Sequence, residues 1–181
     1  MKSFLYSVWE TIEVGVVAVL AVFLIRSYLI QPFLVSGASM EPNFSSGDYL
    51  LIDELTYRFR EPERGEVIVF HYPYDETTYY IKRIIGLSGE RLIFKDGKIT
   101  VFNSRNPNGL TLPEGYLPAG FMTSGKEVVL RDNELFVLGD NRNYSFDSRS
   151  WGSLSKKEIV GLVRLRLWPF TKVLAVEKPI Y

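Results

Sequence analysis

The chain has 181 residues, 46% of them hydrophobic and 14% aromatic, which is enough for the core of one ordinary domain and an appendage. Lys and Arg together number 21, as do Asp and Glu, and this zero net charge argues against a nucleic acid partner. The absence of cysteine excludes disulfides, thiol catalysis and cysteine-based zinc sites. His71 is the single histidine, so a histidine metal cluster is also excluded, and we expect neither a metal nor another cofactor.

One long apolar segment lies near the N-terminus. Residues 14–25 contain no charge, Arg26 interrupts the run, and residues 27–35 are again largely apolar. A membrane-spanning helix needs about 20 predominantly apolar residues. The segment therefore predicts a single transmembrane α-helix over about residues 14–32, with Arg26 reaching the lipid interface and Pro32 at its end.

Two other interpretations of this segment are weaker, and the flanking charges indicate its direction. Glu10 and Glu13 disfavour a cleaved secretory signal, and the absence of a polar face disfavours a helix lying in the interface. Lys2 precedes the segment, whereas no Lys or Arg occurs between Arg26 and Arg58. This asymmetry favours a cytoplasmic N-terminus, with the rest of the chain on the outer side of the cell membrane.

The chain is thus divided into an anchor region, residues 1–32, and a domain of residues 33–181 that is rich in strand signals. Short β-branched and aromatic runs bounded by turn residues predict strands at 48–55, 66–72, 79–86, 127–130 and 135–138. Asp96-Gly97, within residues 92–101, supplies the positive φ angles of a tight hairpin turn. We therefore expect an all-β, mostly antiparallel domain.

Three further segments complete this prediction. Residues 103–126 are rich in Asn, Ser, Pro and Gly and predict a long surface loop with room for one short strand. Residues 155–159 fit a single helical turn. In residues 163–167, apolar residues alternate with Arg164 and Arg166, which predicts a strand with one apolar and one charged face.

The first candidate for chemistry is Ser39, in the stretch VSGASMEPNF of residues 35–44. Small neighbours let another backbone approach the serine, and Pro42 restricts the direction of the chain after it. This arrangement suits a nucleophile at the end of a strand, but by itself it fits an ordinary turn better. His71 ends an apolar run that enters a proline-containing turn, which is typical of a polar residue at a strand end. An activated serine would therefore need a lysine or a carboxylate as its base.

Lys82 is the candidate base. Strand alternation places it on the same face as Tyr80 and Ile84. If this face points inward, desolvation will lower the pKa of the lysine, and the neutral amine can then accept a proton from serine. The alternative is a lysine at a sheet edge that prevents aggregation, and the spacing does not decide between them.

The third stretch, GDNRNYSFDSRSWG at residues 139–152, is unusually dense in hydrogen-bonding groups. It directly follows an apolar strand, and a hydroxyl such as that of Ser145 could orient a lysine amine. Its acidic residues do not have the alternating spacing and closing glutamate of a calcium loop, so we expect no metal here.

Four motifs occur in order along the chain: SGASMEP, RGEVIVF, YIKRIIGLSGE and GDNRNYSFDSRSWG. Together they resemble the motif set of the bacterial type I signal peptidases, or leader peptidases, in their small single-anchor form. The resemblance implies a membrane-bound serine endopeptidase that removes N-terminal signal peptides from exported preproteins by a Ser/Lys dyad. It also implies a signal-peptidase-like β-fold on the outer side of the membrane, with signal peptides and the lipid bilayer as partners.

The resemblance also implies roles for individual residues. Ser39 matches the nucleophile and Lys82 the general base, while Ser145 matches the serine that holds the lysine. The other supporting residues are Asp147, Arg149, Asp140, Asn141 and Arg142. Pockets for small side chains at the −1 and −3 positions of the substrate are expected from Val35, Met40, Phe44 and Ile81.

The chain departs from the family pattern at several positions. Gly37 stands where some members have a serine whose hydroxyl completes the oxyanion hole, so backbone N–H groups, including that of Ser39, are expected to do this alone. The role inferred for Gly37 is to permit close approach. Ser88 replaces a usual proline, and Asn143-Tyr144 replaces a usual Asp-Asn, which affects rate and preference more than reaction type.

Two alternatives remain open at this point. A self-cleaving regulator of the SOS-repressor type shares the Ser/Lys dyad, and the Ala119-Gly120 bond it would cut is present, but residues 1–32 offer no helix-turn-helix. A non-catalytic anchored β-domain is the second alternative, although intact Ser39 and Lys82 argue against it.

Overall fold

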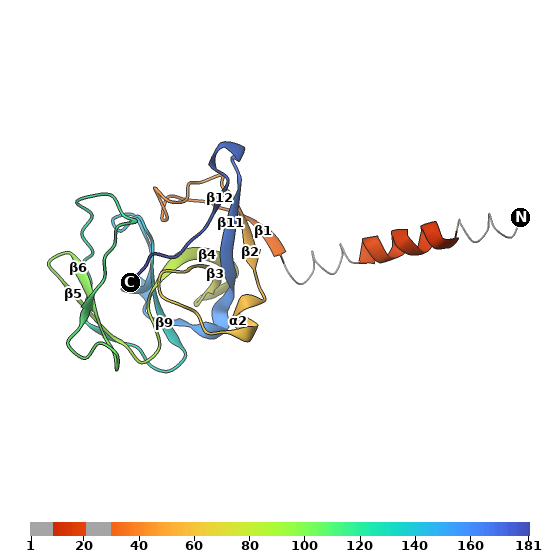
Figure 1. Cartoon of the computed structure of the whole chain (residues 1–181). Helices are drawn as coiled ribbons and strands as arrows, with labels where there is room; N and C mark the ends of the chain where they lie inside the picture. Colours follow the sequence, from red (N-terminus) through yellow and green to blue (C-terminus); the bar gives the residue numbers. More distant parts are fainter. Residues whose placement is uncertain (1–8, 21–29) are drawn as a thin grey trace, which may run out of the picture.

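The computed structural model describes residues 9–20 and 30–181 (Figure 1). Residues 9–20 are helical and lie apart from the β-domain that follows, with apolar side chains such as Val16 and Val19 exposed. Residues 21–29, which make up much of the predicted anchor, lie outside the described residues. Within the described ranges, no helix combines the length and apolarity that crossing a membrane requires.

The predicted end of the anchor is wrong by a few residues. Strand β1 (Ile30–Leu34) pairs antiparallel with β2 (Tyr49–Asp53), so residues 30–32 belong to the β-domain. Pro32 fits this position because β1 is the edge strand of its sheet, and proline, which has no N–H group for the ladder, occurs in sheets mainly on edge strands.

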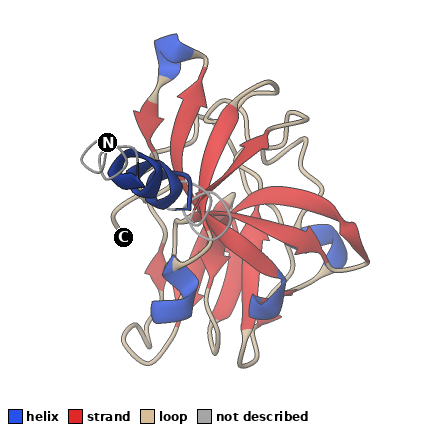
Figure 2. Cartoon of the chain, turned by 90° about the vertical axis from the view of Figure 1, so that its right-hand side faces the viewer, coloured by secondary structure: helices blue, strands red, loops and turns tan. Residues whose placement is uncertain are grey.

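Two antiparallel sheets form the domain, which confirms the mostly antiparallel β prediction (Figure 2). The eight-stranded sheet has the order β1-β2-β11-β3-β4-β9-β10, with β12 paired to β11. Its remaining strands are β3 (Val67–Tyr72), β4 (Asp75–Gly86), β9 (Glu134–Leu138), β10 (Leu154–Ser155), β11 (Ile159–Trp168) and β12 (Leu174–Ala175). The four-stranded sheet consists of β7 (Leu110–Thr111), β6 (Lys98–Phe102), β5 (Arg91–Lys95) and β8 (Val128–Val129).

The structure confirms the predicted hairpin turn and the predicted long loop. Asp96 and Gly97 have φ angles of 51° and 75° and join β5 to β6 as the expected hairpin. The loop of residues 103–126 contains one short strand, β7, as anticipated. The short helical elements are α2 (Thr56–Phe59), α3 (Ser148–Trp151), η1 (Lys156–Glu158) and η2 (Phe170–Lys172), of which only η1 was predicted. Elements of three or four residues are too short for a periodic pattern to reveal.

The prediction of a charged face on β11 is correct for only one of its two arginines. Arg164 is exposed, but Arg166 is 8% exposed and its Nη1 donates to Asp48 Oδ2 at 3.0 Å. Register shifts occur in β11 between Val163 and Leu165 and again between Arg166 and Trp168. Such irregularities interrupt the strict alternation of faces on which the prediction depended.

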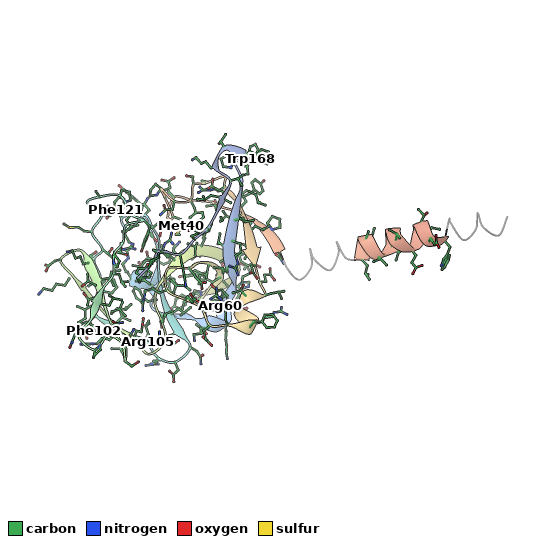
Figure 3. The ribbon with its side chains drawn as sticks, in the orientation of Figure 1. Met40, Arg60, Phe102, Arg105, Phe121 and Trp168 are labelled. Atoms are coloured by element: carbon green, nitrogen blue, oxygen red, sulfur yellow. The ribbon has the colours of Figure 1, made fainter. Side chains whose placement is uncertain are left out.

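The loop of residues 35–48, which carries Ser39, packs on one of three hydrophobic clusters. Val35, Met40 and Phe44 are buried there against side chains of β2, β3 and β11. Figure 3 shows Met40 within the domain and Trp168 at its periphery. The loop after β1 and the loop after β9 meet beside β4, where the Asn141 N–H donates to the Ser39 carbonyl at 3.0 Å. The candidate site lies at this junction.

Candidate active site

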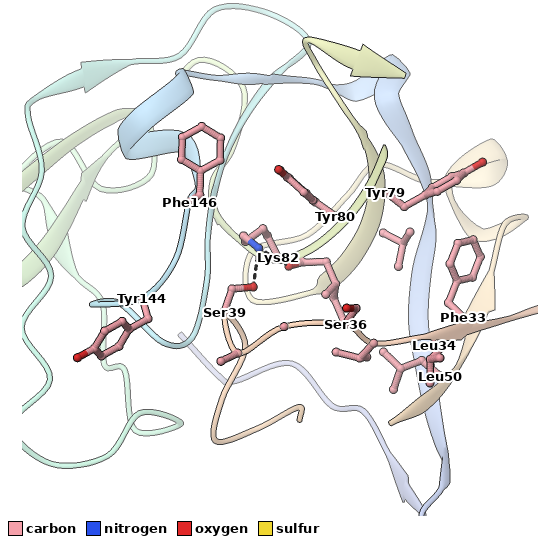
Figure 4. Close-up of a pocket in the computed structure, with 15 residues that line it drawn as sticks. Phe33, Leu34, Ser36, Ser39, Leu50, Tyr79, Tyr80, Lys82, Tyr144 and Phe146 are labelled. Carbon is pink, nitrogen blue, oxygen red and sulfur yellow. Dashed lines mark hydrogen bonds between the residues drawn. The ribbon is translucent and has the colours of Figure 1, made fainter. Parts of the chain in front are cut away.

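Ser39 and Lys82 lie together although they are 43 residues apart in the chain (Figure 4). Lys82 Nζ donates to Ser39 Oγ at 2.8 Å and to the Ile81 carbonyl at 2.9 Å. Ser39 follows β1 in a half-buried turn, and β4 presents Lys82 beneath it. The pair of groups expected from the motifs is therefore assembled by the fold.

The environment of Lys82 favours its neutral form. The side chain is 3% exposed and Nζ lies 5.3 Å from the centroid of the Tyr80 ring, as strand alternation predicted. Burial disfavours the ammonium and lowers the pKa of Lys82 to about 8, while the negative charges of Asp147 and Asp140 oppose this shift in part. About a tenth of the Lys82 side chains are then neutral amines at pH 7, and about half at pH 8.

Asp140 links the loop after β9 to β4 and to the loop that carries Ser39, and we call such a link a brace. Its carboxylate accepts two hydrogen bonds from Arg83, from Nε at 2.8 Å and from Nη2 at 2.7 Å, and a third from Asn43 Nδ2 at 2.8 Å. Because Arg83 and Lys82 are adjacent in β4, their side chains leave opposite faces of the strand. Strand β4 thus presents the Lys82 amine to Ser39 on one face, and on its other face Arg83 holds Asp140 of the loop after β9.

Arg142 forms a second brace on the same loop. Its guanidinium pairs with Glu114, with distances of 2.9 Å from Nη1 to Oε2 and 2.5 Å from Nη2 to Oε1, and also donates to Tyr116 Oη. Its Nε donates to the Gly139 carbonyl at 3.1 Å. Arg142 is 2% exposed, so this network fixes the backbone on either side of Asn141 from within the protein.

Asp147 and Arg149 form the third brace. Arg149 donates to the two oxygens of Asp147 from Nε and Nη2, each at 2.8 Å, and Asp147 also caps the N-terminus of α3. Asp147 Oδ2 accepts the Gly139 N–H at 3.1 Å. The pair therefore attaches the short helix to the end of β9.

Ser145 differs from its expected role. Its Oγ is buried but has no hydrogen-bond partner among the described residues, so it does not hold the Lys82 amine in this structure. It packs against Gly139, where an added Cβ would overlap Ser145 Oγ and the carbonyl oxygen of Ser39. Glycine at 139 lets Ser145 and the loop of residues 35–48 approach one another.

Gly37 also requires a correction. Apart from Gly37 and its two chain neighbours, no atom of the described residues lies within 4 Å of the position that a Cβ would occupy there, so Gly37 does not serve a close approach by another described part of the chain. Its φ of 98° is the feature that favours glycine, because L-residues rarely adopt this conformation.

A cavity of about 320 Å³ opens beside the Ser39–Lys82 pair. Val35 and Ile81 line it, as expected, whereas Met40 and Phe44 are 1% and 2% exposed in the core below and do not. Several residues of its wall are not among those expected from the sequence: Phe33, Leu34, Tyr79, Tyr80, Tyr144 and Phe146. The alternation of Phe33 with Val35 and of Tyr79 with Ile81 was the available signal.

His71 takes no part in this cavity. It lies at the end of β3, as expected, with Nδ1 2.6 Å from the Glu76 carbonyl oxygen. No group of three or more His, Asp or Glu side chains is placed to hold a metal ion within the described part of the chain. Serine beside a buried, partly neutral amine, at the mouth of an open apolar cavity, fits the class of serine hydrolases that use lysine as the base.

Comparison with known proteins agrees with this class. The sequence profile of the family "Signal peptidase, peptidase S26" matches residues 8–168. A probable signal peptidase I-2 of Synechocystis sp. is 36% identical over 171 residues, which covers 90% of this chain and 75% of that one. A signal peptidase I of Bacillus caldolyticus is 36% identical over 163 residues, covering 85% and 88%. The crystal structure of a signal peptidase I from Enterococcus faecalis aligns with a TM-score of 0.46 and 26% identity, over 57% of this chain and 97% of that one.

The chain therefore belongs to the signal peptidase family, peptidase S26. It is a serine endopeptidase of the signal peptidase I type, and its substrates are the signal peptides of preproteins. The family is membrane-associated. This assignment sets aside the self-cleaving repressor and the non-catalytic β-domain as alternatives.

Proposed function

We propose that Ser39 is the nucleophile and Lys82 the general base of this signal peptidase. The observation that supports the roles best is the 2.8 Å contact between Lys82 Nζ and Ser39 Oγ. When the amine is neutral, its lone pair accepts the Ser39 proton as Oγ attacks the scissile carbonyl. The ammonium then returns this proton to the leaving amine, which gives an acyl-enzyme on Ser39. Lys82 next deprotonates the water that hydrolyses the ester.

We infer that the substrate binds in an extended conformation along β4. Residues 79–81 pair with β3 on one side, whereas β9 pairs with β4 only from Arg83 onward, so the other edge of this stretch is unpaired among the described strands. A peptide that adds to such an edge gains main-chain hydrogen bonds, and its alternate side chains enter pockets. Val35 and Ile81 line the cavity with branched apolar side chains, which supports small side chains at −1 and −3 of the substrate.

We further infer an anchor that ends before Ile30, a cytoplasmic N-terminus and a catalytic domain on the outer side of the plasma membrane. The exposed apolar side chains of residues 9–20 and the start of the β-domain at Ile30 support this organisation. Ser39 follows Ile30 by nine residues, which span at most about 30 Å when fully extended. A nucleophile so close to the bilayer can reach a substrate whose own apolar segment remains in the lipid.

The dyad is tested by cleavage of a purified preprotein by the full chain in detergent. Ser39→Ala and Lys82→Met are expected to abolish cleavage, while the matched controls Ser104→Ala and Lys95→Met, at exposed positions, retain it. Cleavage that survives in a folded Ser39 or Lys82 variant contradicts the assignment. A product cut within the enzyme at Ala119-Gly120 would instead indicate self-processing.

A further inference from the structure

Asn141 attaches the nucleophile loop, residues 35–48, to the loop after β9 through two hydrogen bonds. Its backbone N–H donates to the Ser39 carbonyl at 3.0 Å, and its side-chain Nδ2 donates to the Ala38 carbonyl at 3.0 Å. These two carbonyls belong to the peptide units on either side of the Ser39 Cα. One residue, more than a hundred positions away in the chain, therefore holds both peptide units that flank the nucleophile.

The direction of the Ser39 N–H follows from this attachment. The Ala38–Ser39 peptide bond is trans, so the Ala38 C=O and the Ser39 N–H point in opposite directions from one plane. Because the carbonyl faces Asn141, the N–H faces away from it. Within the described part of the chain this N–H donates to no acceptor, and Ser39 lines the cavity.

We propose that Asn141 is a positioning residue that aims the Ser39 N–H at the oxyanion formed during the reaction. This inference rests on the proposed role of Ser39 as the nucleophile. Preorganised donors stabilise a developing oxyanion more than donors that must first reorient. At position 37 this chain has glycine, so no hydroxyl there can share the task, and the backbone donor has to be held in place.

The surroundings of Asn141 suit such a role. Its neighbours Asp140 and Arg142 are 0% and 2% exposed and are fixed by the braces to Arg83 and Glu114. By contrast, Ser36, Gly37 and Ala38 are exposed, so packing does not hold the loop there. A rigid partner thus restrains a segment that has little support of its own.

One other contact could set the direction without Asn141. The Ala38 carbonyl also accepts the Glu41 N–H at 3.2 Å, as part of a turn within the nucleophile loop. If this turn alone orients the peptide, loss of the Asn141 side chain will leave the reaction unchanged. The two possibilities predict different kinetics.

The experiment uses the full chain in detergent with a peptide that spans a signal peptide cleavage site. Asn141→Ala removes the side-chain donor and keeps the backbone N–H, and Asn141→Asp replaces the donor by a carboxylate of the same shape. Asn108→Ala is the control, because Asn108 is exposed, does not line the cavity and makes no side-chain hydrogen bond within the described part of the chain. Thermal unfolding verifies that each variant is folded. If only one of the two Asn141 variants folds, its kinetics alone test the proposal.

We expect kcat to fall about 10- to 100-fold in both Asn141 variants, somewhat less than the 100- to 1,000-fold typical of losing an oxyanion donor outright. KM and the pH midpoint of kcat should stay at the wild-type values. Affinity for a peptide boronate that forms a tetrahedral adduct on Ser39 should fall in parallel with kcat, while affinity for the same peptide with an N-methylated scissile amide should not change.

Three results would overturn the proposal: an unchanged kcat, a loss confined to KM, or a shifted pH midpoint with kcat restored at high pH. The last would mean that Asn141 acts through Lys82. Failure of the dyad itself is recognised separately, because Ser39→Ala would then retain activity and the boronate would not bind through Ser39.

Discussion

At the scale of single residues, Lys82 is placed where a charge is unfavourable. The side chain is 3% exposed, and within the described ranges no carboxylate lies within ion-pair distance of its amine. Its contacts are a hydroxyl, a carbonyl and the ring of Tyr80. Burial without an ion pair disfavours the ammonium form of a lysine and so favours the neutral amine. A general base has to be in the neutral form to accept a proton.

The pH dependence of the reaction follows from this placement. Only the neutral amine accepts the serine proton, so kcat should rise with pH, with a midpoint at or below the Lys82 pKa of about 8, and reach a plateau above it. Single-turnover rates on a soluble peptide between about pH 6 and about pH 10 measure this profile. A rate that rises only near the ordinary lysine pKa would contradict it.

Replacing the lysine should make the protein more stable. Because the folded-state pKa lies below the unfolded value, the unfolded chain binds more protons between pH 8 and pH 10.5, and wild-type stability rises with pH across this window. At pH 7 the unfavourable burial of the charge is present in full. Lys82→Met should therefore raise the free energy of unfolding by up to about 3 kcal/mol at pH 7, with no such rise at high pH.

Urea unfolding at neutral and at high pH measures this effect. Lys95→Met, which replaces an exposed lysine, should change stability by less than about 0.5 kcal/mol and serves as the control. A Lys82→Met variant that is less stable than wild type at neutral pH would show that the hydrogen bonds to Ser39 and Ile81 outweigh the desolvation of the ammonium.

At the scale of elements, β4 connects the chemistry to its support. Lys82 reaches Ser39 on one face, and Arg83 reaches Asp140 on the other. The Arg83 side chain is 5% exposed and that of Asp140 is 0% exposed. Removing one member of a buried ion pair leaves the other charge buried without a counter-charge, which strongly destabilises the fold. Replacing both members by apolar residues leaves no buried charge and is often nearly neutral.

Asp140→Ala should accordingly lower the free energy of unfolding by about 3–5 kcal/mol. The double variant Arg83→Met/Asp140→Leu should recover part of this loss, because no charge then remains buried. Chemical denaturation compares them, with Glu127→Ala as the control: Glu127 pairs with Arg91 at the surface, and its loss should cost at most about 1 kcal/mol. Equal effects of Asp140→Ala and Glu127→Ala would argue against the brace.

At the scale of the whole molecule, the β-domain and the N-terminal helix are separate parts. Strand β1 starts at Ile30 and completes the edge of the large sheet, and the helix of residues 9–20 lies apart from that sheet (Figure 1). The sheets and their clusters are built from residues after position 29. The catalytic machinery therefore does not depend on contacts with the helix.

Removal of residues 1–29 should leave the fold and the hydrolysis of soluble peptides intact, with the free energy of unfolding changed by less than about 1 kcal/mol. The shortened chain should lose its association with phospholipid vesicles, which flotation measures, and should cleave membrane-inserted preproteins more slowly. Undiminished flotation would show that the β-domain binds the membrane by itself. Loss of β-sheet circular dichroism would show that the helix supports the fold.

Local chemistry in the sequence was sufficient for several features. The Asp96-Gly97 turn and the alternation of the main strands follow from short stretches of sequence. The restriction of the base to a lysine or a carboxylate follows from composition, because the chain has a single histidine. Such features depend on backbone preferences of adjacent residues, so neighbours along the chain suffice to specify them. The motif order then indicated the family and the pairing of Ser39 with Lys82.

The tertiary structure alone decided which side chains are buried and what they contact. Met40 and Phe44 belong to the core rather than to the cavity, and Arg166 is buried with Asp48. The Ser145 hydroxyl has no hydrogen-bond partner in the part of the chain that the structure describes. The two hydrogen bonds from Asn141 to the nucleophile loop have no signal in either segment by itself. Burial and hydrogen-bond partners depend on contacts between residues far apart in the chain, and these contacts exist only once the sheets have formed.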